Sequence, residues 1–136
     1  MAKWHDRSHW LERTFSKVVA VPVLAFVGAA LCDWAYTSSM TLQWSNFSGW
    51  LLLMGLVGGM TALLILALVV RTRGDGWLGL GLLGIGLAVE IANFMAHMRD
   101  GYIAVMPLGL TLSVIGALVV IVAAWLTAYP VSGARA

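Results

Sequence analysis

The sequence predicts an all-α integral membrane protein: a four-helix bundle with both termini in the cytoplasm and a short interfacial amphipathic helix at the N-terminus. Only 10% of the 136 residues are charged and 61% are hydrophobic, whereas an ordinary soluble domain carries about 25% charged residues. Four apolar runs have the length of about 20 residues that a spanning helix needs. None of the runs alternates between polar and apolar residues, as the strands of a membrane β-barrel do.

The N-terminal segment, residues 1–17, is expected to be a cytoplasmic interfacial arm. Trp4, Leu11 and Phe15 fall roughly on one face of a helix, and the basic residues of the segment would meet lipid phosphates. The alternative is a frayed, charged tail.

The four spans are expected at residues 18–36, 47–70, 77–98 and 107–127, and together they form one domain. Helices are expected because all backbone groups must be paired within lipid. The connections are short, so neighbouring spans should be antiparallel. Residues 128–136 complete the chain as a cytoplasmic tail.

The distribution of Lys and Arg predicts the orientation in the membrane. The N-terminal arm holds four of the eight basic residues, Arg71 and Arg73 lie between the second and third spans, and Arg135 lies in the tail. Arg99 alone falls on the opposite side. Because cytoplasmic loops carry the excess of Lys and Arg, both termini are expected in the cytoplasm.

Composition also argues against several functions. Basic residues lie at the ends of apolar runs and not on one face, so no nucleic-acid partner is expected. Cys32 is the single cysteine, which excludes an internal disulfide and a CxxC metal site. The spans offer one usable histidine and no preset nucleophile, so neither enzymatic activity nor a protein metal site is expected.

Small residues recur every four positions along the spans, and such faces let helix backbones approach closely. The pattern does not say whether the partner helix belongs to the same chain or to another. The positions are Ala25 and Ala29 in the first span, Gly55 and Gly59 in the second, Gly84, Ala88, Ala92 and Ala96 in the third, and Gly109, Ser113 and Ala117 in the fourth.

Polar residues inside the apolar runs form the candidate ligand-binding site: Asp33, Asn46, Glu90, Asn93 and His97. Such residues are costly in lipid and usually face the interior of a bundle. Three of them are spaced i, i+3, i+7 on one helix face, with Glu90 about 10 Å deeper than His97. Antiparallel packing would bring all five into the outer half of the bundle.

Three interpretations of this cluster stay open. It could be structural, with hydrogen bonds between helices and Glu90 protonated or paired. It could be a lipid, small-molecule or quinone site anchored by Glu90 or His97. His97 could also be an axial ligand of a b-type haem, although bis-histidine ligation needs a second histidine, and His5 and His9 lie on the cytoplasmic arm.

Arg99 and Asp100 follow the third span. They are expected either to end the helix at the level of the lipid headgroups or to form a docking point for a periplasmic partner.

Four sequence segments surround the polar positions: Cys32–Tyr36, Trp44–Leu51, Asn93–Asp100 and Val105–Ser113. In these segments, and in their order and spacing, residues 18–127 resemble the bacterial membrane family known as domain of unknown function 2231. The resemblance implies four transmembrane helices in the inner membrane.

Many members of that family carry a His-Pro pair at the start of the first helix. In this chain the corresponding stretch, Val19–Pro22, keeps the proline and lacks the histidine, so a role that needs this histidine, such as haem ligation, is not implied. Some relatives are associated with periplasmic quinoprotein sugar dehydrogenases, which suggests a membrane anchor or an electron conduit.

The expected function is therefore that of a small non-catalytic accessory or anchor subunit of a larger inner-membrane complex. Its partners would be membrane lipids and other membrane or periplasmic subunits, without a cofactor. The alternative is an electron-transfer subunit that binds quinone or b-type haem and serves a periplasmic dehydrogenase. A proton or solute transporter is a third possibility, and it would require oligomerisation.

Overall fold

The computed structural model describes residues 2–99 and 105–128, and within these residues every regular element is helical. Four helical stretches are long and apolar enough to span a membrane: His9–Ser39, Leu42–Arg73, Trp77–His97 and Val105–Ala128. The elements in chain order are α1 (Ala2–Val18), α2 (Ala20–Ser39), α3 (Leu42–Arg73), α4 (Trp77–His97), the short π-helical segment η1 (Val105–Gly109) and α5 (Leu110–Ala128). The four expected spans are thus present as helices α2 to α5.

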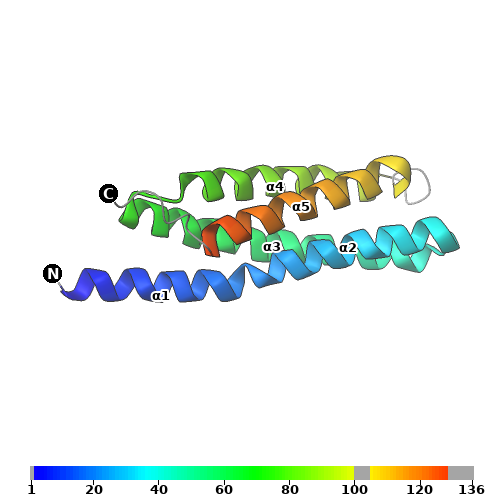
Figure 1. Ribbon diagram of the computed structural model, residues 1–136. Helices are drawn as coiled ribbons and strands as arrows, with labels where there is room; N and C mark the ends of the chain where they lie inside the picture. Colours follow the sequence, from blue (N-terminus) through cyan, green and yellow to red (C-terminus); the bar gives the residue numbers. More distant parts are fainter. Residues whose placement is uncertain (1, 100–104, 129–136) are drawn as a thin grey trace.

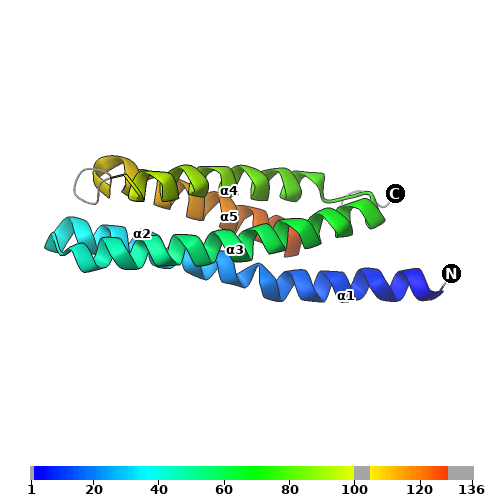
Figure 2. The ribbon, with the colours of Figure 1, turned by 180° about the vertical axis from the view of Figure 1, so that it is seen from behind.

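Helices α2, α3, α4 and α5 form an antiparallel bundle in which consecutive helices are neighbours and α5 closes the ring against α2 (Figures 1 and 2). The connections explain this arrangement. Two residues join α2 to α3, and Met40, at a φ of 51°, ends α2 by donating its backbone N–H to the carbonyl of Tyr36. Gly74 and Gly76, with φ values of 78° and 91°, make the reversal between α3 and α4, because glycine adopts positive φ without steric cost.

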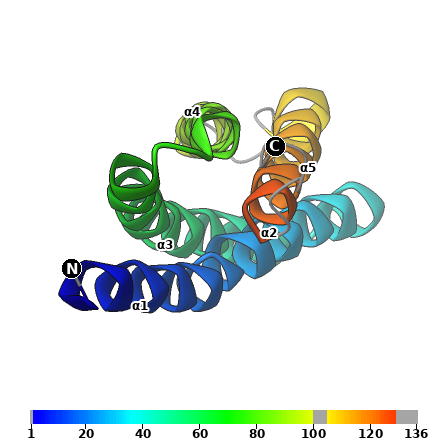
Figure 3. The ribbon, with the colours of Figure 1, turned by 60° about the vertical axis from the view of Figure 1, so that its left-hand side comes forward.

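Helix α1 continues nearly in the direction of α2 and does not turn sideways across the end of the bundle (Figures 1 and 3). The break between the two helices falls at Val19. Pro22 explains the break, because proline has no N–H to bond the carbonyl of Val18. Phe15 is buried, and α1 packs against α3.

The bundle centre is packed by large apolar side chains that lie against glycines of neighbouring helices. A methyl group added to Gly55 would collide with the ring of Phe26, and one added to Gly59 would collide with Leu87. Ala25 and Ala29 on α2 are buried as well, so the predicted small-residue positions of the first two spans serve packing within this chain. The outside of the bundle is apolar as well: Leu24 is 72% and Leu64 65% exposed, as helices surrounded by lipid require.

Candidate functional site

Six polar side chains from all four spanning helices meet inside the bundle, at the end where α2 is joined to α3. We name them the polar cluster: Asp33 on α2, Ser48 on α3, Glu90, Asn93 and His97 on α4, and Ser113 on α5. Five of these residues are fully buried and the His97 side chain is 3% exposed. Buried polar groups are costly unless they are hydrogen-bonded, so their partners decide what the cluster can do.

The centre of the polar cluster is the pair formed by His97 and Asp33. Nε2 of His97 lies 2.9 Å from Oδ1 of Asp33, and Nδ1 lies 3.0 Å from the backbone carbonyl oxygen of Asn93, one turn earlier on α4. Both ring nitrogens thus face oxygens of a carboxyl group and a carbonyl. This geometry suits a protonated imidazole that donates on both sides.

The hydrogen bonds run from one side of the bundle to the other. Ser113 on α5 donates to Oδ2 of Asp33 and accepts a bond of 2.7 Å from Nδ2 of Asn93. The same Nδ2 donates to Oε2 of Glu90 at 3.0 Å. On the opposite side, the Ser48 hydroxyl donates to the carbonyl of Ala29 at 3.3 Å and lies 3.3 Å from Nε2 of His97. The cluster therefore ties all four spanning helices together.

Glu90 is the deepest member of the polar cluster, and Gly116 on α5 makes room for it. A Cβ atom at position 116 would overlap the Glu90 carboxyl group. Within the described ranges, Oε1 of Glu90, Oδ1 of Asn93 and the hydroxyl of Tyr36 are buried without a hydrogen-bond partner. Two of these atoms, on Glu90 and Asn93, belong to the polar cluster, which thus keeps unused hydrogen-bonding capacity on α4.

Four of the five predicted site residues lie together in the cluster, and Asn46 does not. Asn46 is exposed and lines a groove beside the cluster. Two helical positions correspond to a rotation of about 200°, so Ser48, two residues later, points inward from α3 instead. Ser48 was not among the site residues predicted from the sequence. Ser113 was predicted only as a small packing residue, and its spacing of four from Gly109 was the signal that Ser113 faces a neighbouring helix.

The predicted docking pair lies at the far end of α4. Arg99 is exposed just after the helix, and Asp100 lies outside the described residues. The backbone N–H of Arg99 donates to the carbonyl of Ala96 at 3.2 Å, and the docking role of the pair stays a prediction.

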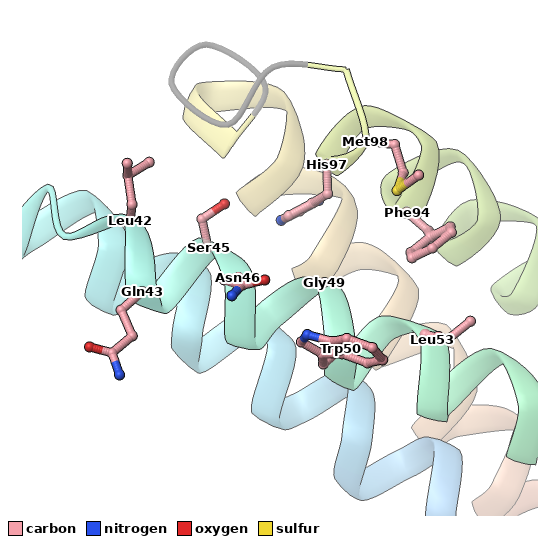
Figure 4. A pocket seen from close by; sticks show the side chains of 10 residues that line it. All are labelled: Leu42, Gln43, Ser45, Asn46, Gly49, Trp50, Leu53, Phe94, His97 and Met98. Carbon is pink, nitrogen blue, oxygen red and sulfur yellow. The ribbon is translucent and has the colours of Figure 1, made fainter.

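A groove between α3 and α4 adjoins the polar cluster, and His97 lines both. Its volume is about 730 Å³. Figure 4 shows Trp50 and Leu53 on α3 opposite Phe94 on α4, and the His97 ring points from α4 toward the beginning of α3. The complete lining is Leu42, Gln43, Ser45, Asn46, Gly49, Trp50, Leu53, Phe94, His97 and Met98. The groove is therefore polar near the start of α3 and apolar farther along the helix.

The described residues fit neither a metal ion nor a haem. No group of three or more His, Cys, Asp and Glu side chains among residues 2–99 and 105–128 could hold a metal ion. His97 was the predicted haem ligand, but its Nε2 points to Asp33. Iron binding at this atom would displace the carboxyl group and leave Asp33 buried without its partner.

Comparison with known proteins finds no matching family model, no matching curated protein and no matching solved structure. The resemblance to domain of unknown function 2231 therefore stays a prediction.

Proposed function

We propose that this chain is a small non-catalytic accessory or anchor subunit that packs against another membrane protein in the bacterial inner membrane. One observation carries the proposal: α4 has a face of small residues that its own bundle does not use. Within lipid, such a face lets another helix approach closely.

The unused face consists of Gly81, Gly84, Ala88 and Ala92. A Cβ atom at either glycine would meet nothing within 4 Å, and both alanines are exposed. The opposite face of the same helix behaves differently, because a Cβ at Gly86 would meet Val120. Helix α4 thus has two small-residue faces, and only one is filled by this chain.

Both termini are proposed to lie in the cytoplasm. Arg13 and Lys17 on α1 and Arg71 and Arg73 on α3 belong to the end of the bundle opposite to Arg99 (Figure 1). An excess of basic residues marks the cytoplasmic side. In this orientation the polar cluster lies in the periplasmic half, and the basic residues of α1 lie near the cytoplasmic headgroups.

Affinity purification in lipid nanodiscs extracted from native membranes tests the proposed function. We expect a different membrane protein to co-purify at fixed stoichiometry, and the Gly84→Leu variant to lose it because the added side chain holds the partner helix away. Gly49→Leu is the matched control, since a Cβ at Gly49 also meets nothing within 4 Å but lies in the groove.

Two outcomes of this purification would contradict the accessory role. One is a wild-type protein that purifies alone. The other is a partner that is only a second copy of this chain.

The alternative role, electron transfer or the binding of quinone or haem, divides into two cases. Haem ligation is disfavoured by the bond between His97 and Asp33, and a Soret band that disappears in His97→Ala would overturn this conclusion. Quinone binding, the second case, is supported by the groove beside the polar cluster.

A further inference from the structure

We propose that the groove between α3 and α4 binds an uncharged, lipid-soluble molecule with a flat ring that carries carbonyl oxygens, of the quinone class. This inference goes beyond the accessory role, because it concerns a different face of α4 and does not need a partner subunit. Four features of the groove support it.

The first feature is the polarity along the groove. Gln43, Ser45 and Asn46 lie near the beginning of α3, and Leu53 lies about 10 Å farther along the helix at 1.5 Å per residue. A molecule with a polar head and a hydrocarbon tail matches this gradient, with its tail directed along the apolar end.

The second feature is the charge of the lining. None of the ten residues that line the groove is Lys, Arg, Asp or Glu. His97 has both ring nitrogens engaged, by Asp33 and by the carbonyl of Asn93. A phosphate or carboxylate head would find no free cationic partner among these residues, and the charge-assisted bonds that such anions need are absent from the lining. An uncharged head fits better.

The third feature is the shape of the groove. Gly49 leaves open space where another residue would place its side chain, between residues that belong to facing helices. Trp50 on α3 and Phe94 on α4 bound this part of the groove (Figure 4). Aromatic side chains prefer offset stacked or edge-to-face contacts with other rings, so a flat ring suits the site better than a branched headgroup does.

The fourth feature is a set of hydrogen-bond donors that the described fold does not use. The side chains of Gln43, Ser45 and Asn46 make no hydrogen bond in the part of the chain that the structure describes. Their hydroxyl and amide groups can donate to ring carbonyl oxygens. Asp33 acts here as a positioning residue, because it holds the His97 ring that forms the wall of the groove.

Titration of the purified protein in nanodiscs with decylubiquinone, followed by tryptophan fluorescence, tests the proposal. We expect saturable quenching at one quinone per chain. Gly49→Leu should raise the Kd about tenfold or more, which corresponds to about 1.4 kcal/mol, because its side chain occupies the space of the ring. Asn46→Leu should raise the Kd by a smaller factor. Gly84→Leu is the matched control and should leave the Kd unchanged.

Competition distinguishes a quinone from a lipid headgroup. Phosphatidylglycerol or diacylglycerol added in excess should not displace the quinone. Displacement by either lipid would overturn the proposal, as would quenching that is unsaturable or equal in wild type, Gly49→Leu and Asn46→Leu. Circular dichroism establishes that each variant is folded, and Asn46→Leu provides the test if Gly49→Leu does not fold. Failure here leaves the accessory role intact, since that role depends on co-purification and Gly84.

Discussion

The two halves of the bundle contain similar helices but are held together by different interactions. In the half with the α2–α3 connection, Asp33, Asn93 and His97 are hydrogen-bonded across helices. In the half with the α3–α4 connection, the core consists of apolar residues such as Leu66 and Leu83. Because lipid tails are as apolar as leucine, burial does little to bring these helices together. The apolar half therefore depends on close-fitting shapes, and the polar half depends on specific hydrogen bonds.

This difference matters for function because the groove opens beside the polar half. The hydrogen bonds fix the angle of the His97 ring, which lines the groove. A site built on such supporting contacts keeps its geometry better than one that lies on a loop. The interior of the apolar half contributes packing, and an ion pair between Arg73 and Glu12 lies at the end of this half. Four predictions separate these interactions from the hydrogen bonds of the polar half.

The largest effect is expected for Asp33→Ala, in the polar half. Removal of the carboxyl group leaves His97 and Ser113 buried without their common partner. The loss of one member of a buried pair costs about 3–5 kcal/mol. The free energy of unfolding in micelles, measured by denaturant titration with far-UV circular dichroism, checks this value. Asp33→Asn should cost less, and a loss below about 1 kcal/mol for Asp33→Ala would show that the pair contributes little.

The second largest loss of stability is expected where a side chain is added to the closely packed apolar interior. Gly59→Leu should cost about 1–3 kcal/mol, because the new side chain overlaps Leu87 and forces repacking. Gly81→Leu, on the outer face of α4, should change the free energy of unfolding by no more than about 0.5 kcal/mol. Equal costs for the two variants would contradict the assignment of inner and outer faces.

A smaller effect is expected for Ser48→Ala in the polar half. The variant loses the bond to the carbonyl of Ala29 and the contact with His97, and single hydrogen bonds between membrane helices contribute about 0.6 kcal/mol on average. The same unfolding measurement applies, with Ser45→Ala as the control. Ser45 makes no hydrogen bond among the described residues, and a cost that equals that of Ser48→Ala would remove the role given to Ser48.

The smallest effect is expected at the end of the apolar half, where Arg73 lies 2.7 Å from Glu12 on α1. Both side chains are about one-third exposed, and exposed ion pairs contribute about 0.2–1 kcal/mol. Arg73→Ala should therefore lower the free energy of unfolding by no more than about 1 kcal/mol. The difference should shrink as salt is added. A larger loss that is insensitive to salt would contradict the assignment of this contact as a screened surface ion pair.

The sequence was sufficient to place the spanning helices and most of the polar cluster, because apolar length and polar spacing depend on one helix at a time. It did not show which side of the second span, now α3, faces inward. Asn46 and Ser48 illustrate this limit: both are polar residues of the same helix, and only Ser48 enters the cluster. In a helix that is apolar all around, hydrophobic periodicity does not separate the inner face from the outer face.

The small-residue pattern of the third span shows the same limit. Gly84 and Ala88 have the spacing of a packing face, yet the face that packs inside the bundle includes Gly86 and Asn93. The groove could not be predicted either, because its walls come from α3 and α4 and depend on how these helices lie side by side. The direction of α1 depends likewise on contacts between helices that are distant in sequence.

The measurement that tests the central claim most directly is photo-crosslinking in native membranes from a photoreactive residue at position 88, followed by mass spectrometry. The same residue at position 64 on α3, which is exposed on another side of the bundle, is the control. The accessory role predicts a single adduct with a different membrane protein from position 88 and no such adduct from position 64. The absence of this adduct, or an adduct with a second copy of the chain alone, would contradict it.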